Sequence, residues 1–320
     1  MPISCIKCLT KNQIIAVNIY SVLLEDVVLS VYLNYGLAEL NLQYNPQVWS
    51  QDFDRSTMLS NAKSIEVRSK YHVFDDLSYG NRAEEKLDIV IGNAMNEAQP
   101  VPVFVFFHGG WWNQGSKQDA CYPAEMILEK KGVFVAVNFA KIENATLSEI
   151  VRQSQAAVAW VYHNIADYGG NPDQIFICGK SSGAQQAGMV LATDWRKYEA
   201  PADLIKGAVL VSGIYDLEPL SLSDRRTQIG LNEAFVKELS PFRKIANLSA
   251  DQACDLILVY AENDSDETKR QSVAFAESWR KAGFICAIIE ETGVDHYSIA
   301  VPMGNPNSAM GRATLALMGL

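Results

Sequence analysis

The stretch Gln174–Gly183, Gln-Ile-Phe-Ile-Cys-Gly-Lys-Ser-Ser-Gly, decides the fold, because an apolar run passes directly into a glycine-flanked turn. The apolar half predicts a buried strand over Gln174–Cys178, and the small residues of Ser181–Ala192 predict a helix. The chain has to turn sharply between them, which glycine permits because it has no Cβ. The stretch therefore predicts a strand, a tight turn and a helix in succession.

Two adjacent serines lie in this turn, and the glycine spacing distinguishes them. Gly179 and Gly183 lie two residues on either side of Ser181, whereas no glycines flank Ser182 at that distance. A serine nucleophile on a strand-to-helix turn needs small neighbours at those positions, which is the G-x-S-x-G pattern. We therefore predict that Ser181 is the catalytic nucleophile and that Ser182 contributes only its backbone N–H.

The same alternation of apolar runs and helical segments extends along the chain. Further strands are predicted at Ile65–Asp75, Leu87–Ile91, Val101–Phe107, Val133–Asn138, Lys206–Ser212, Asp255–Tyr260 and Phe284–Glu290, the first two as edge strands. Further helices are predicted at Asp119–Lys131, Thr146–Tyr168 and Glu267–Ala282. Strands that alternate with long helices indicate a mostly parallel sheet with functional loops at the carboxyl ends of its strands. The pattern predicts an α/β fold with a mostly parallel central sheet flanked by helices.

The expected domain organisation follows from where the alternation of strands and helices begins and where it is interrupted. We expect a single domain over 39–320, preceded by an extension over 1–38 to which no role is assigned. Residues 216–250 form short, polar, helix-like pieces, which predict a small cap insertion over the site. The chain has 320 residues, which is within the range of one such domain.

The extension contains an apolar run, Ile14–Leu24, preceded by Lys7 and Lys11, in the outline of a signal peptide. Glu25 and Asp26 follow where a cleavage site of small residues would lie, and they would be costly within a membrane span. We favour an extra helix or strand packed on the domain. A signal or anchor, or extra translated sequence, are the alternatives.

The amino-acid composition limits the classes of molecule that the protein is expected to bind. The net charge of −10 opposes binding to nucleic acid, so we expect a small-molecule substrate, with no stable membrane association. A homodimer is compatible with the sequence. Cys5 and Cys8 have the spacing of half a zinc site, but no second Cys/His pair follows, so neither a metal nor another cofactor is expected. The other cysteines lie mostly in apolar runs, which favours a reducing, cytoplasmic location.

The general base is sought among four histidines, His72, His108, His163 and His296. His296 follows the last predicted strand, where the chain order Ser…Asp/Glu…His places the base. We therefore predict His296 as the base. The alternative is a loop histidine that only contacts Tyr297.

The acid that orients this histidine should follow the strand Asp255–Tyr260, in a loop with four carboxylates, Glu262, Asp264, Asp266 and Glu267. Spacing alone does not choose between them. We favour Asp264, with Asp266 as the alternative.

His108-Gly109-Gly110-Trp111 directly follows the buried strand Val101–Phe107 and has the form of an oxyanion-hole loop. The predicted donors are the N–H groups of Gly109, Gly110 and Ser182. Trp111 and Trp112 are either core residues or part of an aromatic substrate pocket. Lys180 either extends along apolar surface with its charge in water, or biases the pocket toward a substrate that carries a carboxylate.

These motifs together resemble the kynurenine formamidase (arylformamidase) group of α/β-hydrolases, near the hormone-sensitive-lipase-like esterases. The similar segments are LNLQYNPQVW (40–49), HGGWW (108–112), TLSEIVRQ (146–153), SGIYDLEPL (212–220), Ser240-Pro241, NDSDETKRQS (263–272) and VDHYSI (294–299). The acid loop of that group implies Asp264 as the acid, and its D-H-F segment implies His296 as the base. The resemblance covers about residue 39 onward.

The resemblance implies hydrolysis of an N-formyl aryl amide such as N-formylkynurenine through a Ser181–His296–Asp264 triad. A carboxylesterase for small acyl esters is the alternative, because the same groups would serve it. A non-catalytic ligand-binding member of the fold is a third interpretation, which the presence of all three triad residue types opposes.

Overall fold

The computed structural model describes residues 30–93 and 100–320. Its centre is an eight-stranded sheet in the order β1-β2-β4-β3-β5-β6-β7-β8. The strands are β1 (His72–Ser78), β2 (Lys86–Ile91), β3 (Val101–Phe107), β4 (Val133–Val137), β5 (Gly170–Lys180), β6 (Ile205–Val211), β7 (Asp255–Ala261) and β8 (Cys286–Glu291). The β1–β2 and β2–β4 pairs are antiparallel, and the other five pairs are parallel. This is the α/β-hydrolase fold that the sequence predicts.

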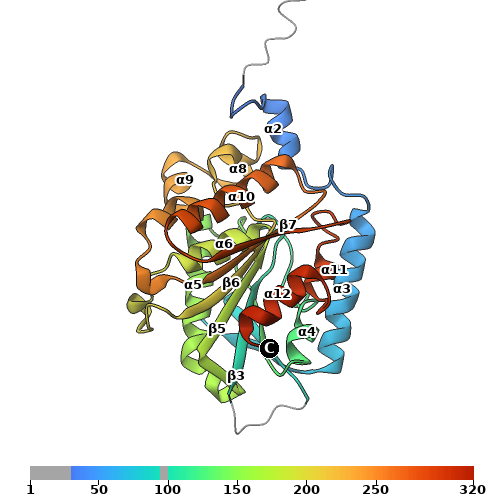
Figure 1. Cartoon of the computed structure of the whole chain (residues 1–320), viewed down its shortest axis with the longest axis vertical. Helices are drawn as coiled ribbons and strands as arrows, with labels where there is room; N and C mark the ends of the chain where they lie inside the picture. The colour runs from blue at the N-terminus through green and yellow to red at the C-terminus, as the bar shows by residue number, and fades with distance from the viewer. Residues whose placement is uncertain (1–29, 94–99) are drawn as a thin grey trace, which may run out of the picture.

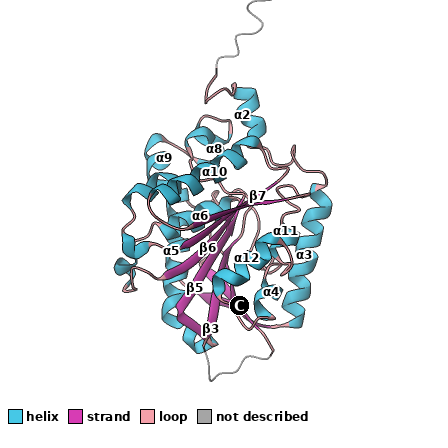
Figure 2. Ribbon diagram, in the orientation of Figure 1, coloured by secondary structure: helices cyan, strands magenta, loops and turns pink. Residues whose placement is uncertain are grey.

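Helices cover both faces of the sheet (Figure 1). The α-helices are α2 (Leu37–Gln43), α3 (Phe53–Lys70), α4 (Ala124–Leu128), α5 (Leu147–Asn164), α6 (Ser182–Leu191), α7 (Glu218–Ser221), α8 (Arg225–Ile229), α9 (Glu233–Leu239), α10 (Asp266–Lys281), α11 (Ala300–Met303) and α12 (Ala309–Met318). Short 3₁₀ helices are η1 (Ile165–Tyr168), η2 (Trp195–Tyr198), η3 (Pro241–Asn247) and η4 (Ala250–Gln252). In Figure 2, α2, α8 and α9 gather toward one end of the molecule, beyond the strands.

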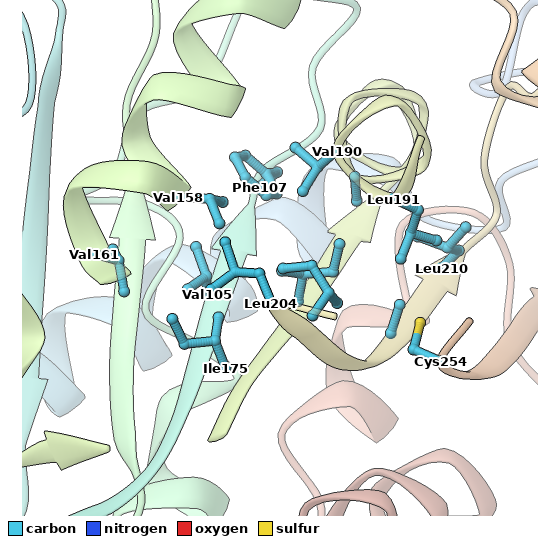
Figure 3. Close-up of a cluster of buried hydrophobic side chains, with 14 of the residues drawn as sticks. Val105, Phe107, Val158, Val161, Ile175, Val190, Leu191, Leu204, Leu210 and Cys254 are labelled. Carbon is cyan, nitrogen blue, oxygen red and sulfur yellow. The ribbon is translucent and has the colours of Figure 1, made fainter. Parts of the chain in front are cut away.

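The central strands are apolar throughout because both of their faces are covered. In β3, Val105 and Phe107 point into a core cluster with α5, α6 and α10, which Figure 3 shows around Val158 and Val190. The intervening Phe106 points into a second cluster with α3, α4, α11 and α12. Burial of each such side chain contributes roughly 1.5–3 kcal/mol, so the two clusters hold the sheet between its helical layers.

Most predicted elements are confirmed, but the early part of the chain needs three corrections. Residues 65–70 belong to α3, because the apparent alternation lies on a helix whose Ile65 is 70% exposed. β2 is paired on both sides and is therefore not an edge strand. The helix predicted at Asp119–Lys131 is reduced to Ala124–Leu128.

The segment 216–250 consists of short helices, α7, α8, α9 and η3, as expected from its sequence. The division into an extension and one domain stays a prediction, since Cys5, Cys8 and the apolar run Ile14–Leu24 lie outside the described residues. Of the helices in the described ranges, none is both long and apolar enough to cross a bilayer.

A buried ion cluster joins the antiparallel strands to the loop after β3. Asp88 in β2 has no exposed side-chain surface and accepts hydrogen bonds from Arg68 of α3 at 2.7 Å and from Lys117 at 2.6 Å. Lys117 also pairs with Asp76 at 2.8 Å and is itself 2% exposed. Because a buried charge needs a partner, this cluster fixes the loop that carries Lys117.

We expect Lys117→Met to lower the free energy of unfolding by about 3–5 kcal/mol, because it leaves the buried Asp88 carboxylate with an incomplete set of partners. Urea unfolding followed by circular dichroism measures the loss. Lys206→Met is the control, since it breaks a pair with Asp203, whose side chain is 61% exposed, and should cost no more than about 1 kcal/mol. Equal losses in the two variants would contradict the assigned role of the cluster.

Candidate active site

Ser181 lies in the turn between β5 and α6. Its backbone has φ 55° and ψ −123°, in a region that residues with a Cβ rarely adopt. The Ser181 N–H donates to the carbonyl of Val211 at 2.8 Å, which anchors the turn to β6. Such strain persists only where the surrounding structure enforces it, and it is typical of functional turns.

The two glycines of the turn are required by close packing. A Cβ on Gly183 would lie 2.1 Å from the carbonyl oxygen of Phe107, and a Cβ on Gly179 would lie 2.2 Å from that of Gly183. The first turn of α6 therefore lies directly against the end of β3. These close contacts are the physical reason why glycines are needed two residues before and two residues after Ser181.

The structure brings Ser181, His296 and Asp264 together from three separate loops. The His296 Nε2 atom lies 2.9 Å from the Ser181 Oγ atom, and the His296 Nδ1 atom lies 2.8 Å from Asp264 Oδ1. The serine and the histidine are 6% and 8% exposed, so both are shielded but reachable. The chain can pass a proton from the hydroxyl to the imidazole in this arrangement.

Asp264 is held by more than the histidine. Its second carboxylate oxygen accepts hydrogen bonds from the Ser212 hydroxyl at 2.6 Å and from the Ala261 N–H at 2.8 Å. Burial alone would raise the pKa of this carboxyl, but the charge of His296 and these hydrogen bonds outweigh it and lower the pKa. Asp264 is therefore ionised, whereas Asp266, the alternative acid, is exposed at the start of α10.

The glycine loop after β3 runs beside Ser181. A Cβ on Gly109 would lie 3.1 Å from the Cβ of Ser181, and Gly110 has φ 115°, which favours glycine. Within residues 30–93 and 100–320, the N–H groups of Gly109 and Gly110 donate to no other residue. Ser182 follows at the N-terminus of α6, so its N–H points out of the helix end.

These groups open on a cavity of about 350 Å³, which is within the size range of small-molecule sites. Trp111 and Lys180 line it together with Ser181 and His296. Trp112 does not line it; its side chain is fully buried in a third core cluster, so only the core interpretation of Trp112 holds.

Burial lowers the pKa of Lys180 to about 8, and the charges of Asp264 and Asp295 oppose that effect only in part. The lysine ammonium lies 5.6 Å from the centre of the Tyr297 ring. Lys180 therefore faces the cavity and an aromatic ring.

Two cavity residues have no signal in the sequence that identifies them beforehand. Tyr297 follows the histidine, and Arg225 comes from α8 in the 216–250 segment. The Arg225 guanidinium lies 4.1 Å from the centre of the Trp111 ring. Arg225 is one of two adjacent arginines, and only the fold shows which of them reaches the site.

The described residues contain no group of three or more His, Cys, Asp or Glu side chains placed to hold a metal ion. The chemistry that this arrangement offers is that of a serine, a histidine and a carboxylate in series.

Comparison with known proteins agrees with this geometry. The family model BD-FAE matches residues 87–279. The chain is 31% identical over 288 residues to a kynurenine formamidase from Danio rerio, covering 88% of this chain and 96% of that protein. The chain belongs to the kynurenine formamidase family. Like other members of this family, it is a hydrolase.

More distant relatives of the family are esterases. The chain is 28% identical over 226 residues to Esterase LipQ from Mycobacterium tuberculosis, which covers 65% of this chain and 53% of that protein. The structure resembles an esterase from Pyrobaculum calidifontis with a TM-score of 0.64 at 17% identity, covering 87% and 97% of the two chains. This second likeness concerns the fold alone.

We expect Gly183→Ala to lower the stability of the protein by at least about 3 kcal/mol, because the new methyl group would overlap the Phe107 carbonyl. Thermal unfolding and the soluble yield measure the effect. Gly283→Ala is the control without steric overlap: unlike Gly183, which lies in helix α6, Gly283 has a left-handed backbone with φ 93°, but nothing lies within 4 Å of the new Cβ. The control should cost roughly 1 kcal/mol, and a similar loss in both variants would refute the steric explanation.

Proposed function

We propose that the chain hydrolyses an N-formyl aryl amide of the N-formylkynurenine type through Ser181, His296 and Asp264. The proposal is supported chiefly by the hydrogen-bonded series of these three side chains at a cavity of suitable size. The 31% identity to a kynurenine formamidase over most of both chains supports the choice of a formamide. A cytoplasmic location is part of the proposal, since Cys121, Cys178, Cys254 and Cys286 are free and buried.

The first half of the proposed reaction forms an acyl-enzyme. Ser181 Oγ attacks the formyl carbon while its proton passes to His296 Nε2, and the ionised Asp264 stabilises the resulting imidazolium. The N–H groups of Gly109, Gly110 and Ser182 stabilise the negative charge that develops on the formyl oxygen. His296 then gives the proton to the leaving arylamine nitrogen as the carbon–nitrogen bond breaks.

The second half releases formate. A water molecule gives its proton to His296 and attacks the formyl carbon of the Ser181 ester, and the same N–H groups receive the oxyanion. The ester bond breaks as Ser181 Oγ takes the proton back from His296, which returns the enzyme to its starting state. No step requires a metal or an organic cofactor.

Hydrolysis of small acyl esters is the second candidate, because Esterase LipQ is among the relatives. Both reactions use the same groups and differ in the leaving atom. An amine leaves only after protonation, so the formamide depends more strongly on His296 as an acid than an activated ester does.

We expect the enzyme to hydrolyse N-formylkynurenine with a higher kcat/KM than p-nitrophenyl acetate, measured side by side by absorbance. Ser181→Ala should lower kcat on both substrates by roughly 10⁴-fold or more and abolish labelling by a fluorophosphonate. Ser182→Ala removes only a side chain and should retain the labelling. Ester hydrolysis without formamide turnover would replace the first candidate with the second, and labelling of Ser181→Ala would exclude Ser181 as the nucleophile.

Asp264→Asn should lower kcat by about 10⁴-fold, because a neutral amide cannot stabilise the imidazolium of His296. Asp266→Asn, two residues along the same loop, should leave kcat within about threefold of the wild type, since its side chain is exposed. Steady-state kinetics on the preferred substrate distinguish the two. A large loss in Asp266→Asn with a small loss in Asp264→Asn would reverse the assignment.

A further inference from the structure

Two cations line the candidate active-site cavity without a carboxylate partner. Lys180 and Arg225 are both half-buried, and within the described ranges neither forms an ion pair. The Arg225 Nε atom donates to the carbonyl of Tyr44 at 2.8 Å, which leaves the terminal nitrogens of the guanidinium free to bind another group. Lys180 has no hydrogen-bond acceptor for its ammonium group among the described residues.

Other partly or fully buried cations in the described ranges, in contrast, form ion pairs with carboxylates. Lys117 pairs with Asp88, Arg270 with Glu267, and Arg243 with Asp216. A cation withdrawn from water ordinarily has such a partner, because desolvation without one is costly. The two cavity cations lack an anion of the protein's own.

Nearby carboxylates do not fill that role. Asp264 is occupied by His296, Ser212 and Ala261. The Asp295 carboxylate accepts four hydrogen bonds, from the Ser50 hydroxyl and from the N–H groups of Gln51, Tyr297 and Ser298. Asp119, the one acidic residue that lines the described part of the cavity, is exposed and accepts from Ser116.

Aromatic rings hold the two cations in place. The Lys180 ammonium lies 5.6 Å from the centre of the Tyr297 ring, and the Arg225 guanidinium lies 4.1 Å from that of Trp111. Lys180, Arg225 and Tyr297 all line the same cavity. A cation on an aromatic face keeps its charge available on its other side.

We propose that Arg225 and Lys180 form a carboxylate-binding subsite that selects substrates with an anionic group on the leaving part. The inference rests on the proposed function in one respect: a formyl group has a single carbon, so the anionic group belongs to the arylamine side. A guanidinium and an ammonium are the side chains that bind carboxylates most strongly, and a bound carboxylate supplies the missing partner to both.

The test uses two substrate pairs that differ only in charge. The ester pair is 3-(4-acetoxyphenyl)propionate and its primary amide, and the formamide pair is N-formylkynurenine and its carboxamide. The ester pair is informative even when formamides are not turned over, so failure of the subsite and failure of the proposed function are separable. If neither pair is turned over, calorimetric binding of 3-(4-hydroxyphenyl)propionate and its amide replaces the kinetics.

The wild type should favour the anionic member of each pair. Arg225→Met should raise KM, or Kd, for that member roughly 10- to 100-fold while the value for the neutral member changes less than about twofold. Lys180→Met should shift the same ratio in the same direction, and Arg225→Lys should retain part of the preference. Arg226→Met is the matched control, because this neighbour is exposed and its Nε atom donates to Leu231 outside the cavity.

Equal KM or Kd values of the wild type for the anionic and neutral members of a pair would overturn the proposal. So would equal effects of Arg225→Met and Lys180→Met on both members, since a structural role for the cations predicts losses that do not depend on substrate charge.

Discussion

The contact between the first turn of α6 and the end of β3 is the constraint on which the candidate site depends. The carbonyl of Phe107 occupies the space that any side chain on residue 183 would need, so the helix and the strand approach to backbone distance. This approach forces Ser181 into a left-handed conformation, which costs of order 1–3 kcal/mol. In return, the loop that begins at His108 starts at a fixed distance from the serine hydroxyl, as an oxyanion site requires.

The molecule as a whole is acidic, whereas its cavity is lined by two cations. The net charge is −10, yet Lys180 and Arg225 give the cavity a local positive field. Exposed acidic groups beyond about 8 Å are screened at physiological ionic strength, whereas two cations in contact with a ligand are not. The overall acidity therefore does not oppose a carboxylate-bearing substrate once the substrate reaches the cavity.

The sheet and Ser181 could be predicted from local sequence patterns, and His296 from the chain order, whereas spacing left Asp264 and Asp266 as alternatives and the resemblance to the family favoured Asp264. Continuous apolar runs mark strands covered on both faces, and glycine spacing identifies Ser181. Ile65 and Val67 alternate with charged residues, which predicts a strand, but residues 65–70 are helical and, of these two side chains, only Val67 is buried. The Asp52 side chain, which accepts from the Arg55 N–H, is the capping signal that indicates this helix.

The cavity wall could not be predicted in the same way, because its residues meet only through tertiary contacts. Trp111 and Trp112 are adjacent and chemically identical, yet one lines the cavity and the other is buried in the core. Of Arg225 and Arg226, only Arg225 lines the cavity, whereas Arg226 is exposed to solvent. Which member faces the cavity depends on the path of a short loop or helix, and side-chain type carries no information about that path.

The segment that precedes α3 contacts both Arg225 and Asp295, which lies next to His296 in the chain. Asn41 exchanges two hydrogen bonds with Asp224, and the Tyr44 carbonyl holds Arg225, so this segment positions the proposed anion subsite. Ser50 and Gln51, a few residues later, hold Asp295 beside the histidine.

One stretch of chain thus contacts both the 216–250 segment and the loop of His296, although it contributes no member of the three-residue series. The Ser181 turn does not depend on this segment for its anchor, because the Ser181 N–H donates to the carbonyl of Val211 in β6.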